Sequence, residues 1–247
     1  MNKEIRLVNG EGQNYLSLIC KEIIAYFQNL QIRMDEMPID IKGGMPCPRF
    51  CPAEINILGF HQIHLTMTNY SYWCQVIFQL SHELTHYFIY CYCKDERQKA
   101  SWIEETICEA ISLYFLAWYG ENWEKTLIYR YNTGYGKSVN EYLENEIQNK
   151  GTRRLTLCQS YQELMEVDRT SQERREDRQA ERNELFNLIH ARDILGLISY
   201  RDYIIQDKKI LDCDRYLEDY AYNFPVRYLC DLQKKVLSED KLKSQEA

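Results

Sequence analysis

Two histidines four residues apart, His82 and His86, form with Glu83 the pattern H-E-x-x-H inside a predicted helix. Residues at this spacing share one helical face, so both imidazoles can bind a single ion at about 2.0–2.1 Å each. Glu83 is too close in sequence to bind beside both histidines, but it can reach a water on the metal. Zinc lowers the pKa of such a water, and a carboxylate can take its proton as the water attacks a carbonyl. The motif therefore predicts a site for one Zn²⁺ ion with Glu83 as general base.

A catalytic zinc site needs a third protein ligand beside its open position, so a further oxygen or nitrogen donor is expected nearby. Eighteen residues separate His86 from Glu105, which lies on the next predicted helix, and an antiparallel helix pair would bring this carboxylate beside the histidines. Glu104 competes for the role, but it completes a capping box that begins at Ser101. Glu109, one turn beyond Glu105, can accept a ring N–H from a metal-bound histidine and orient it. We therefore expect Glu105 as the third ligand.

The order H-E-L-T-H, eighteen residues and then W-I-E-E-T-I-C-E resembles the gluzincin metallopeptidases, above all their aminopeptidase-N-like branch. Trp102 and Glu105 fall on that branch's tryptophan and ligand glutamate. The similarity covers residues 82 to about 111, and it implies a zincin-like fold that hydrolyses peptide bonds. It also implies that a strand near residues 55–65 is the sheet edge that pairs with extended substrates. The chain lacks the G-A-M-E-N segment that this branch uses to hold a free amino end, so exopeptidase specificity is not implied.

Hydrophobic spacing and turn residues predict the elements that position these side chains. Helices are expected over residues 14–28, from 69 or 71 to 87, over 101–120, from 138 onward and over 185–236; residues 55–65 are expected as a strand and 43–52 as a loop. The pattern predicts an α+β fold that is mostly helical, with a small sheet packed on the H-E-x-x-H helix and a helical C-terminal region.

The expected organisation is a zincin-like metallopeptidase domain over residues 1–167, followed by a charged connector and a helical region over 168–247. The segment Asp168–Glu184 is almost wholly polar. Such a composition is typical of either a solvated helix or a flexible connector.

Peptide hydrolysis by this route needs a donor for the oxyanion that forms during attack. The candidates are Tyr129, Tyr131, Tyr135 and His190. Tyr135 stands between two glycines, a setting that predicts an exposed and mobile side chain. We therefore assign the catalytic donor role to Tyr135.

A second, structural zinc site could be built from Cys47, Cys51, His61 and His64. The spacing departs from the usual finger pattern, and histidines three apart on a strand point to opposite faces. A proline-rich loop and ordinary strand residues are the favoured interpretation, and binding of a second metal by the two cysteines stays open.

The chain of 247 residues carries a net charge of −7, and no basic block dominates it, so nucleic acid is not an expected partner. Its polar start lacks the apolar core of a secretory leader, and no run of about 18 apolar residues predicts a membrane span. The 10 cysteines are therefore expected to be reduced thiols of a cytoplasmic protein.

The expected function is a zinc metallopeptidase that acts on a peptide or protein substrate. The alternative from another class is a catalytically silent zinc-binding interaction module that docks through its helical C-terminal region. A plain helical protein without metal is the third interpretation. The presence of Glu83 within the motif favours the enzyme.

Overall fold

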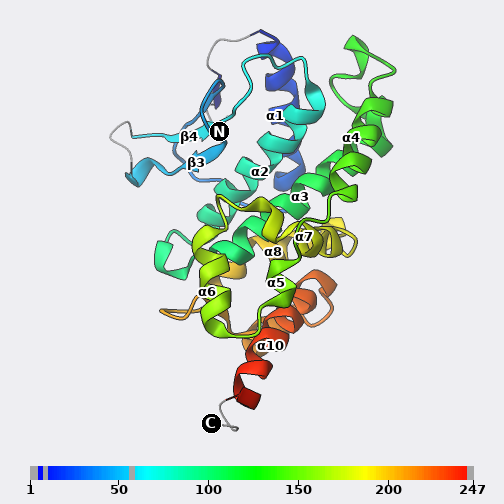
Figure 1. Ribbon diagram of the computed structural model, residues 1–247. Helices are drawn as coiled ribbons and strands as arrows, with labels where there is room; N and C mark the ends of the chain where they lie inside the picture. Colours follow the sequence, from blue (N-terminus) through cyan, green and yellow to red (C-terminus); the bar gives the residue numbers. More distant parts are fainter. Residues whose placement is uncertain (1–4, 8–10, 56–58, 244–247) are drawn as a thin grey trace. The chain divides into compact units, whose positions relative to one another are not determined.

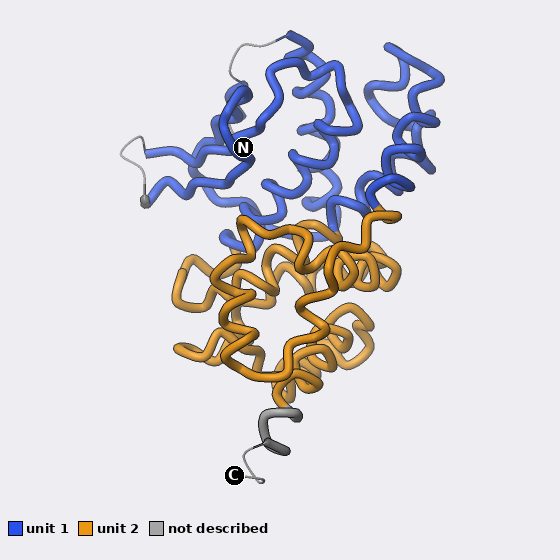
Figure 2. The backbone as a smooth tube through the Cα atoms, viewed as in Figure 1, with its two compact units in different colours: residues 1–91, 111–146 blue, residues 92–110, 147–247 orange. Residues whose placement is uncertain are grey.

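The computed structural model describes residues 5–7, 11–55 and 59–243. The chain forms two compact units: Met1–Cys91 with Ile111–Glu146, and Tyr92–Ala110 with Ile147–Ala247 (Figure 2). Helix α3 (Ser101–Asn122) contributes its first ten residues to the second unit and the rest to the first. The expected boundary at residue 167 instead lies within helix α6 (Tyr161–Thr170).

The first unit contains a small mixed sheet, of which strands β3 and β4 are labelled in Figure 1, and its strand order is β1-β2-β4-β3. Its strands are β1 (Ile5–Leu7), β2 (Ile39–Lys42), β3 (Arg49–Cys51) and β4 (His61–His64). Strands β1, β2 and β4 are parallel, and β3 runs antiparallel to β4. The class predicted from the sequence, α+β with mostly helical content, is confirmed.

Two expectations about the sheet were wrong. The strand predicted near residues 55–65 is only His61–His64, and it lies between β2 and β3 rather than at an edge; residues 56–58 lie outside the described part. The predicted loop over 43–52 contains β3, whose Phe50 packs its ring on Tyr87 and Tyr90. Packing of this partly buried aromatic ring offsets the poor strand propensity of a segment bounded by prolines.

Helices α1 (Gln13–Asn29), α2 (Trp73–Tyr92), the later part of α3 and α4 (Gly136–Gln148) complete the first unit. Phe27 of α1 contacts both α2 and α3, because its ring centroid lies 4.3 Å from that of Phe88 in α2 and 5.4 Å from that of Phe115 in α3. The sheet packs on α2 through His61, whose ring centroid lies 5.5 Å from that of Tyr87. The helices predicted over residues 14–28, from 69 or 71 to 87, over 101–120 and from 138 onward are thus confirmed, as is the sheet on the H-E-x-x-H helix.

Helix α3 continues two residues beyond Gly120, where the sequence predicted its end. A side chain at this position would overlap Asn140 of α4. The glycine therefore serves close helix packing rather than helix termination.

The second unit consists of the start of α3, several short helices, a two-stranded hairpin and the final helix. The helices are α5 (Arg154–Leu157), α6, α7 (Gln179–Phe186), α8 (Ile194–Ile198), α9 (Cys213–Asp219) and α10 (Phe224–Lys243), and the strands are β5 (Ile204–Ile205) and β6 (Ile210–Leu211). Short 3-10 helices join elements along the chain: η1 (Ala53–Ile55), η2 (Glu96–Gln98), η3 (Trp123–Lys125), η4 (Tyr129–Tyr131), η5 (Arg175–Asp177), η6 (Ala191–Asp193) and η7 (Tyr200–Tyr203). The region predicted as helical over 185–236 therefore also holds a small hairpin.

The polar segment Asp168–Glu184 is neither a solvated helix nor a connector. Most of its members are buried: Asp168, Thr170, Ser171, Asp177, Arg178, Gln179, Glu181, Arg182 and Asn183. Arg178 and Arg182 form ion pairs with Glu109 of α3, and Asp177 forms one with Arg154. Charged groups can be buried when they are paired, so the polar composition of this segment led to an incorrect prediction of solvent exposure.

Candidate metal centre

Helix α2 presents His82 and His86 on one face. Their Nε2 atoms lie 3.1 Å apart, and the rings meet edge to face with 4.8 Å between centroids. The helix is fixed by apolar neighbours of the motif, Leu80 and Leu84, both fully buried. His86 is buried and His82 is partly exposed. The two imidazoles therefore converge on one point from a rigid helix.

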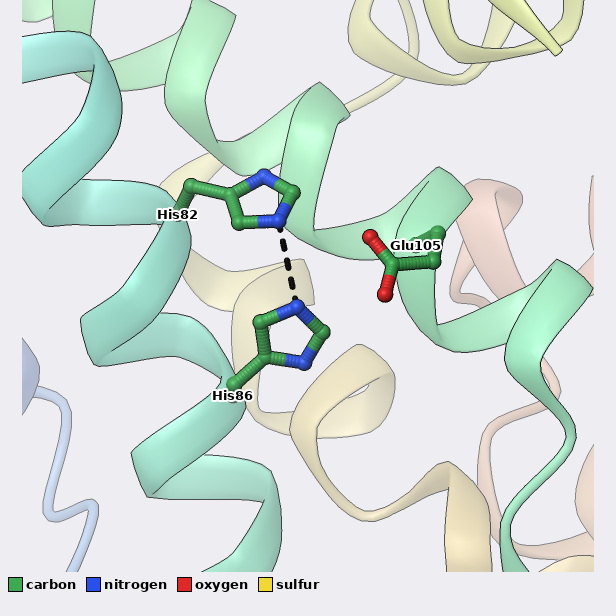
Figure 3. Close-up of side chains that lie close together, drawn as sticks. All are labelled: His82, His86 and Glu105. Carbon is green, nitrogen blue, oxygen red and sulfur yellow. Dashed lines mark hydrogen bonds between the residues drawn. The ribbon is translucent and has the colours of Figure 1, made fainter. Parts of the chain in front are cut away.

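Glu105 of α3 completes the group. One ligand atom from each of His82, His86 and Glu105 lies within 4.8 Å of the other two. Figure 3 shows the carboxylate directed toward the imidazole pair. Within residues 5–7, 11–55 and 59–243, these three form the one set of His, Cys, Asp and Glu side chains close enough to share an ion. The structure therefore brings together the three side chains that the sequence analysis predicted as metal ligands.

The donor set fits a zinc ion in chemistry and approximately in size. Two imidazole nitrogens and one carboxylate oxygen are common zinc ligands, and bond lengths of about 2.0–2.1 Å in a tetrahedron place neighbouring donors roughly 3.3 Å apart. The Nε2 atoms of His82 and His86 already have nearly this separation, at 3.1 Å. A rotation about the side-chain bonds of Glu105 that moves its carboxylate oxygen by roughly one to two ångströms would bring this oxygen to the same distance from the two nitrogens.

Glu83, the expected general base, follows His82 on α2 and is buried. Two hydroxyls on the same helix turn inward: Ser81 donates to the carbonyl of Ile77, and Thr85 donates to that of Ser81. These bonds satisfy polar side chains that the packed helix hides from water. The carboxylate of Glu83 thus lies between two hydroxyl residues, Ser81 and Thr85, whose side chains are bonded within the helix.

Glu104, the rival for the third ligand position, is bound to cations of the second unit. Its carboxylate accepts hydrogen bonds from Arg201 Nε at 2.8 Å and from the Tyr200 hydroxyl, and Lys99 Nζ lies 3.4 Å away. Burial, and next the charge of Glu104, raise the pKa of Tyr200 well above its usual value, so the phenol stays a donor. These contacts fix Glu104 in an ion cluster and favour Glu105 for the metal position.

Glu109, expected to orient a metal-bound histidine, accepts from three guanidinium groups. Arg178 Nη2 lies 2.8 Å from Oε1, and Oε2 lies 3.1 Å from Arg175 Nε and 3.3 Å from Arg182 Nη1. Arg178 and Arg182 are 1% and 0% exposed. A contact of Glu109 with a histidine ring stays a prediction.

Tyr135 lies beside the first turn of α2, away from the histidines. Cys74 Sγ donates to its hydroxyl at 3.5 Å, and its ring packs on Trp73 and Trp123. Cys74 precedes His82 by eight residues, about 12 Å along a helix axis. The side chain is half-buried rather than exposed, and the structure does not bring it together with the three predicted ligands.

The other residues considered for the oxyanion role are engaged elsewhere. Tyr131 packs edge to face on Tyr15, and the backbone N–H of His190 donates to Asp193 at the start of η6. Tyr129 belongs to the short helix η4. None of the three shares a hydrogen bond with the metal group among the interactions described for this part of the chain.

The possible second zinc site does not form in the described residues. His61 is fully buried, and its Nδ1 accepts from the backbone N–H of Ala53. Cys51 pairs in register with Gln62, and Cys47 is exposed. All ten cysteines are free thiols.

Sequence reasoning missed the basic residues that hold the start of α3. Arg175, Arg178 and Arg182 have the spacing i, i+3, i+7, which on a continuous helix would place the cations on one face, although the structure divides them between η5 and α7. This spacing was a usable signal, but the acidic partner lies far away in sequence.

No family model matches the chain, and neither a curated protein nor a solved structure was found to be similar to it. Among the described residues, no helix combines the length and apolar character needed to cross a bilayer.

Proposed function

We propose that this chain is a zinc-dependent peptidase of the gluzincin type, with His82, His86 and Glu105 as the metal ligands. The observation that carries the proposal is the convergence of these three ligand atoms within 4.8 Å. A helix pair that aims two imidazoles and one carboxylate at one point is the arrangement that a three-ligand catalytic zinc site requires.

The chain's own residues supply the remaining chemistry. Zinc bound at such a site acidifies a water molecule to a pKa of about 7 and polarises a carbonyl. Glu83 is the general base: its carboxylate accepts the proton of the attacking water and then returns it to the leaving amine.

The substrate we propose is a peptide or protein segment in extended form. Strand β3 is at the end of the sheet order, and its Phe50 contacts Tyr87 and Tyr90 of α2. A sheet edge beside the motif helix suits backbone pairing with an extended chain. We therefore propose β3, rather than the strand near residues 55–65 that the resemblance implied, as the sheet edge that pairs with the substrate.

A catalytically silent zinc module is the second candidate. Its support is the low exposure of two ligands, 8% for His86 and 7% for Glu105, which limits access to the ion. The partial exposure of His82 leaves one approach for a substrate. The peptidase and the silent module would both bind zinc, but only the peptidase would hydrolyse a substrate.

The test combines metal analysis with the Glu83→Gln variant. Purified wild-type protein should hold about one equivalent of zinc, and less than about a tenth would overturn both candidates. Digestion of a proteome-derived peptide library should yield cleavage products with wild type and with the exposed control Glu141→Gln, but not with Glu83→Gln at equal zinc content. Equal product yields for wild type and Glu83→Gln would overturn the peptidase proposal and leave the zinc module.

A further inference from the structure

We infer that Arg175, Arg178 and Arg182 are positioning residues for the metal centre, acting through Glu109 on the turn of α3 that carries Glu105. This inference rests on the proposed function, because it presupposes that Glu105 is a metal ligand. The inference gives the polar segment Asp168–Glu184 a role in the metal site, whereas its composition indicated a connector or a solvated helix.

The contacts converge on a single carboxylate. Arg178 donates to Oε1 of Glu109, while Arg175 and Arg182 donate to Oε2. Both oxygens are therefore held, and the direction of the carboxylate is fixed as well as its charge. Guanidinium groups suit this task because their donors have a rigid planar geometry, which a lysine ammonium lacks.

Helix geometry transmits this hold to Glu105. Residues four apart are offset by about 40° around the axis and by about 6 Å along it. Glu105 and Glu109 thus share one face, one turn apart, and a rigid helix passes any rotation at one position to the other. A shift of the helix start would move the Glu105 carboxylate relative to its partners.

Two further anchors act on the same ten residues. The backbone N–H of Trp102 donates to Asp168 Oδ1 at 3.1 Å, so an α6 carboxylate binds the first turn of α3. Arg201 holds Glu104 on a different side of the helix from Glu109. Anchors on separate sides restrain both rotation and translation of this segment.

The energetics of buried ion pairs support a positioning role. Buried ionic clusters contribute little net stability compared with well-packed apolar groups, because desolvation cancels much of their attraction. What such a cluster can supply is one defined geometry. Metal affinity depends on that geometry, because groups that orient ligands change metal binding by roughly 10- to 100-fold.

The experiment compares two arginines of similar exposure that bind different carboxylates. Arg175, 38% exposed, binds Glu109 at 3.1 Å, and Arg154, 34% exposed, binds Asp177 at 3.1 Å without a described contact to α3. Arg175→Ala is the test, Arg154→Ala the matched control, and Arg178→Lys a second test that keeps the buried charge. Zn²⁺ affinity is measured by chelator competition, and the visible absorption of the Co²⁺-loaded protein reports ligand geometry.

We expect Arg178→Lys to raise the Kd for Zn²⁺ by about tenfold, the lower end of the range for groups that orient ligands. Arg175→Ala should raise it less, yet more than Arg154→Ala does, and only the two test variants should alter the Co²⁺ spectrum. If Arg178→Lys fails to fold, Arg175→Ala still decides the matter. Test variants that match Arg154→Ala in affinity and spectrum would overturn the positioning role and leave the metal site intact. Absence of Zn²⁺ binding by wild type would overturn both.

Discussion

The Nε2 atoms of His82 and His86 lie 3.1 Å apart, and the two imidazoles face each other through these atoms. At this distance the two nitrogens can share one hydrogen bond, in which one ring donates from Nε2 and the other accepts. The separation is also close to the roughly 3.3 Å that tetrahedral zinc imposes on its donors. The spacing of the pair is therefore compatible with the proposed metal site, and the proposal can be tested residue by residue.

The first prediction separates two adjacent glutamates. Glu105→Gln should weaken Zn²⁺ binding by more than the roughly 10- to 100-fold that loss of an orienting group costs, because it removes a charged ligand. Glu104→Gln should instead lower the free energy of unfolding by about 3–5 kcal/mol, because the buried Arg201 loses its buried partner and keeps only the half-exposed Glu96. Chelator competition gives the first quantity and urea unfolding of the metal-free protein the second.

The second prediction concerns Tyr135. Its hydroxyl accepts from Cys74, which lies about 12 Å along the axis of α2 from His82. We therefore expect Tyr135→Phe to change the kcat of peptide hydrolysis by less than about threefold, whereas removal of an oxyanion donor costs roughly 10²- to 10³-fold. Steady-state kinetics on a cleaved peptide decides it, with Tyr131→Phe as the control. A loss of two orders of magnitude for Tyr135→Phe alone would restore its assignment as the oxyanion donor.

The helices of the metal centre could be predicted from the sequence because their apolar spacing and the H-E-x-x-H pattern are local signals. The same holds for Glu105, whose distance from the motif fits a following antiparallel helix. Strand β3 could not be predicted, since three residues carry no periodicity and its Phe50 is stabilised by Tyr87 and Tyr90.

The buried arginines could not be predicted for a different reason. Polar composition indicates exposure unless a partner is known, and Glu109 lies 69 residues from Arg178 and 73 from Arg182. The neighbouring glycines led to the prediction that Tyr135 is exposed and mobile. A side chain at Gly136 would overlap Trp123, so this glycine permits close packing rather than mobility.

The third prediction is a pH dependence of stability in the sheet. Burial, and next the charges of Lys42 and Arg49, lower the pKa of His64 below its usual value. Between the lowered pKa and about 6.5, the unfolded chain binds more protons than the folded one, so stability falls as pH decreases through that window. His64→Gln should flatten this slope between pH 7.5 and 5 in urea unfolding, and Arg49→Gln should reduce it. Equal slopes for wild type and His64→Gln would contradict the assignment.

The fourth prediction contrasts two arginines of the same polar segment. Arg182 is fully buried and binds Glu109, whereas Arg174 has an exposed side chain. Arg182→Ala should lower the free energy of unfolding by about 3–5 kcal/mol, because it leaves a cavity and an imbalance in a buried ion cluster. Arg174→Ala should change it by less than about 0.5 kcal/mol, as expected for an exposed position. Urea unfolding of the metal-free proteins measures both values without any contribution from ligand binding. If both variants lost equally little stability, Arg182 would be as dispensable as a solvated residue, and the segment would have to be treated as the connector that its composition first indicated.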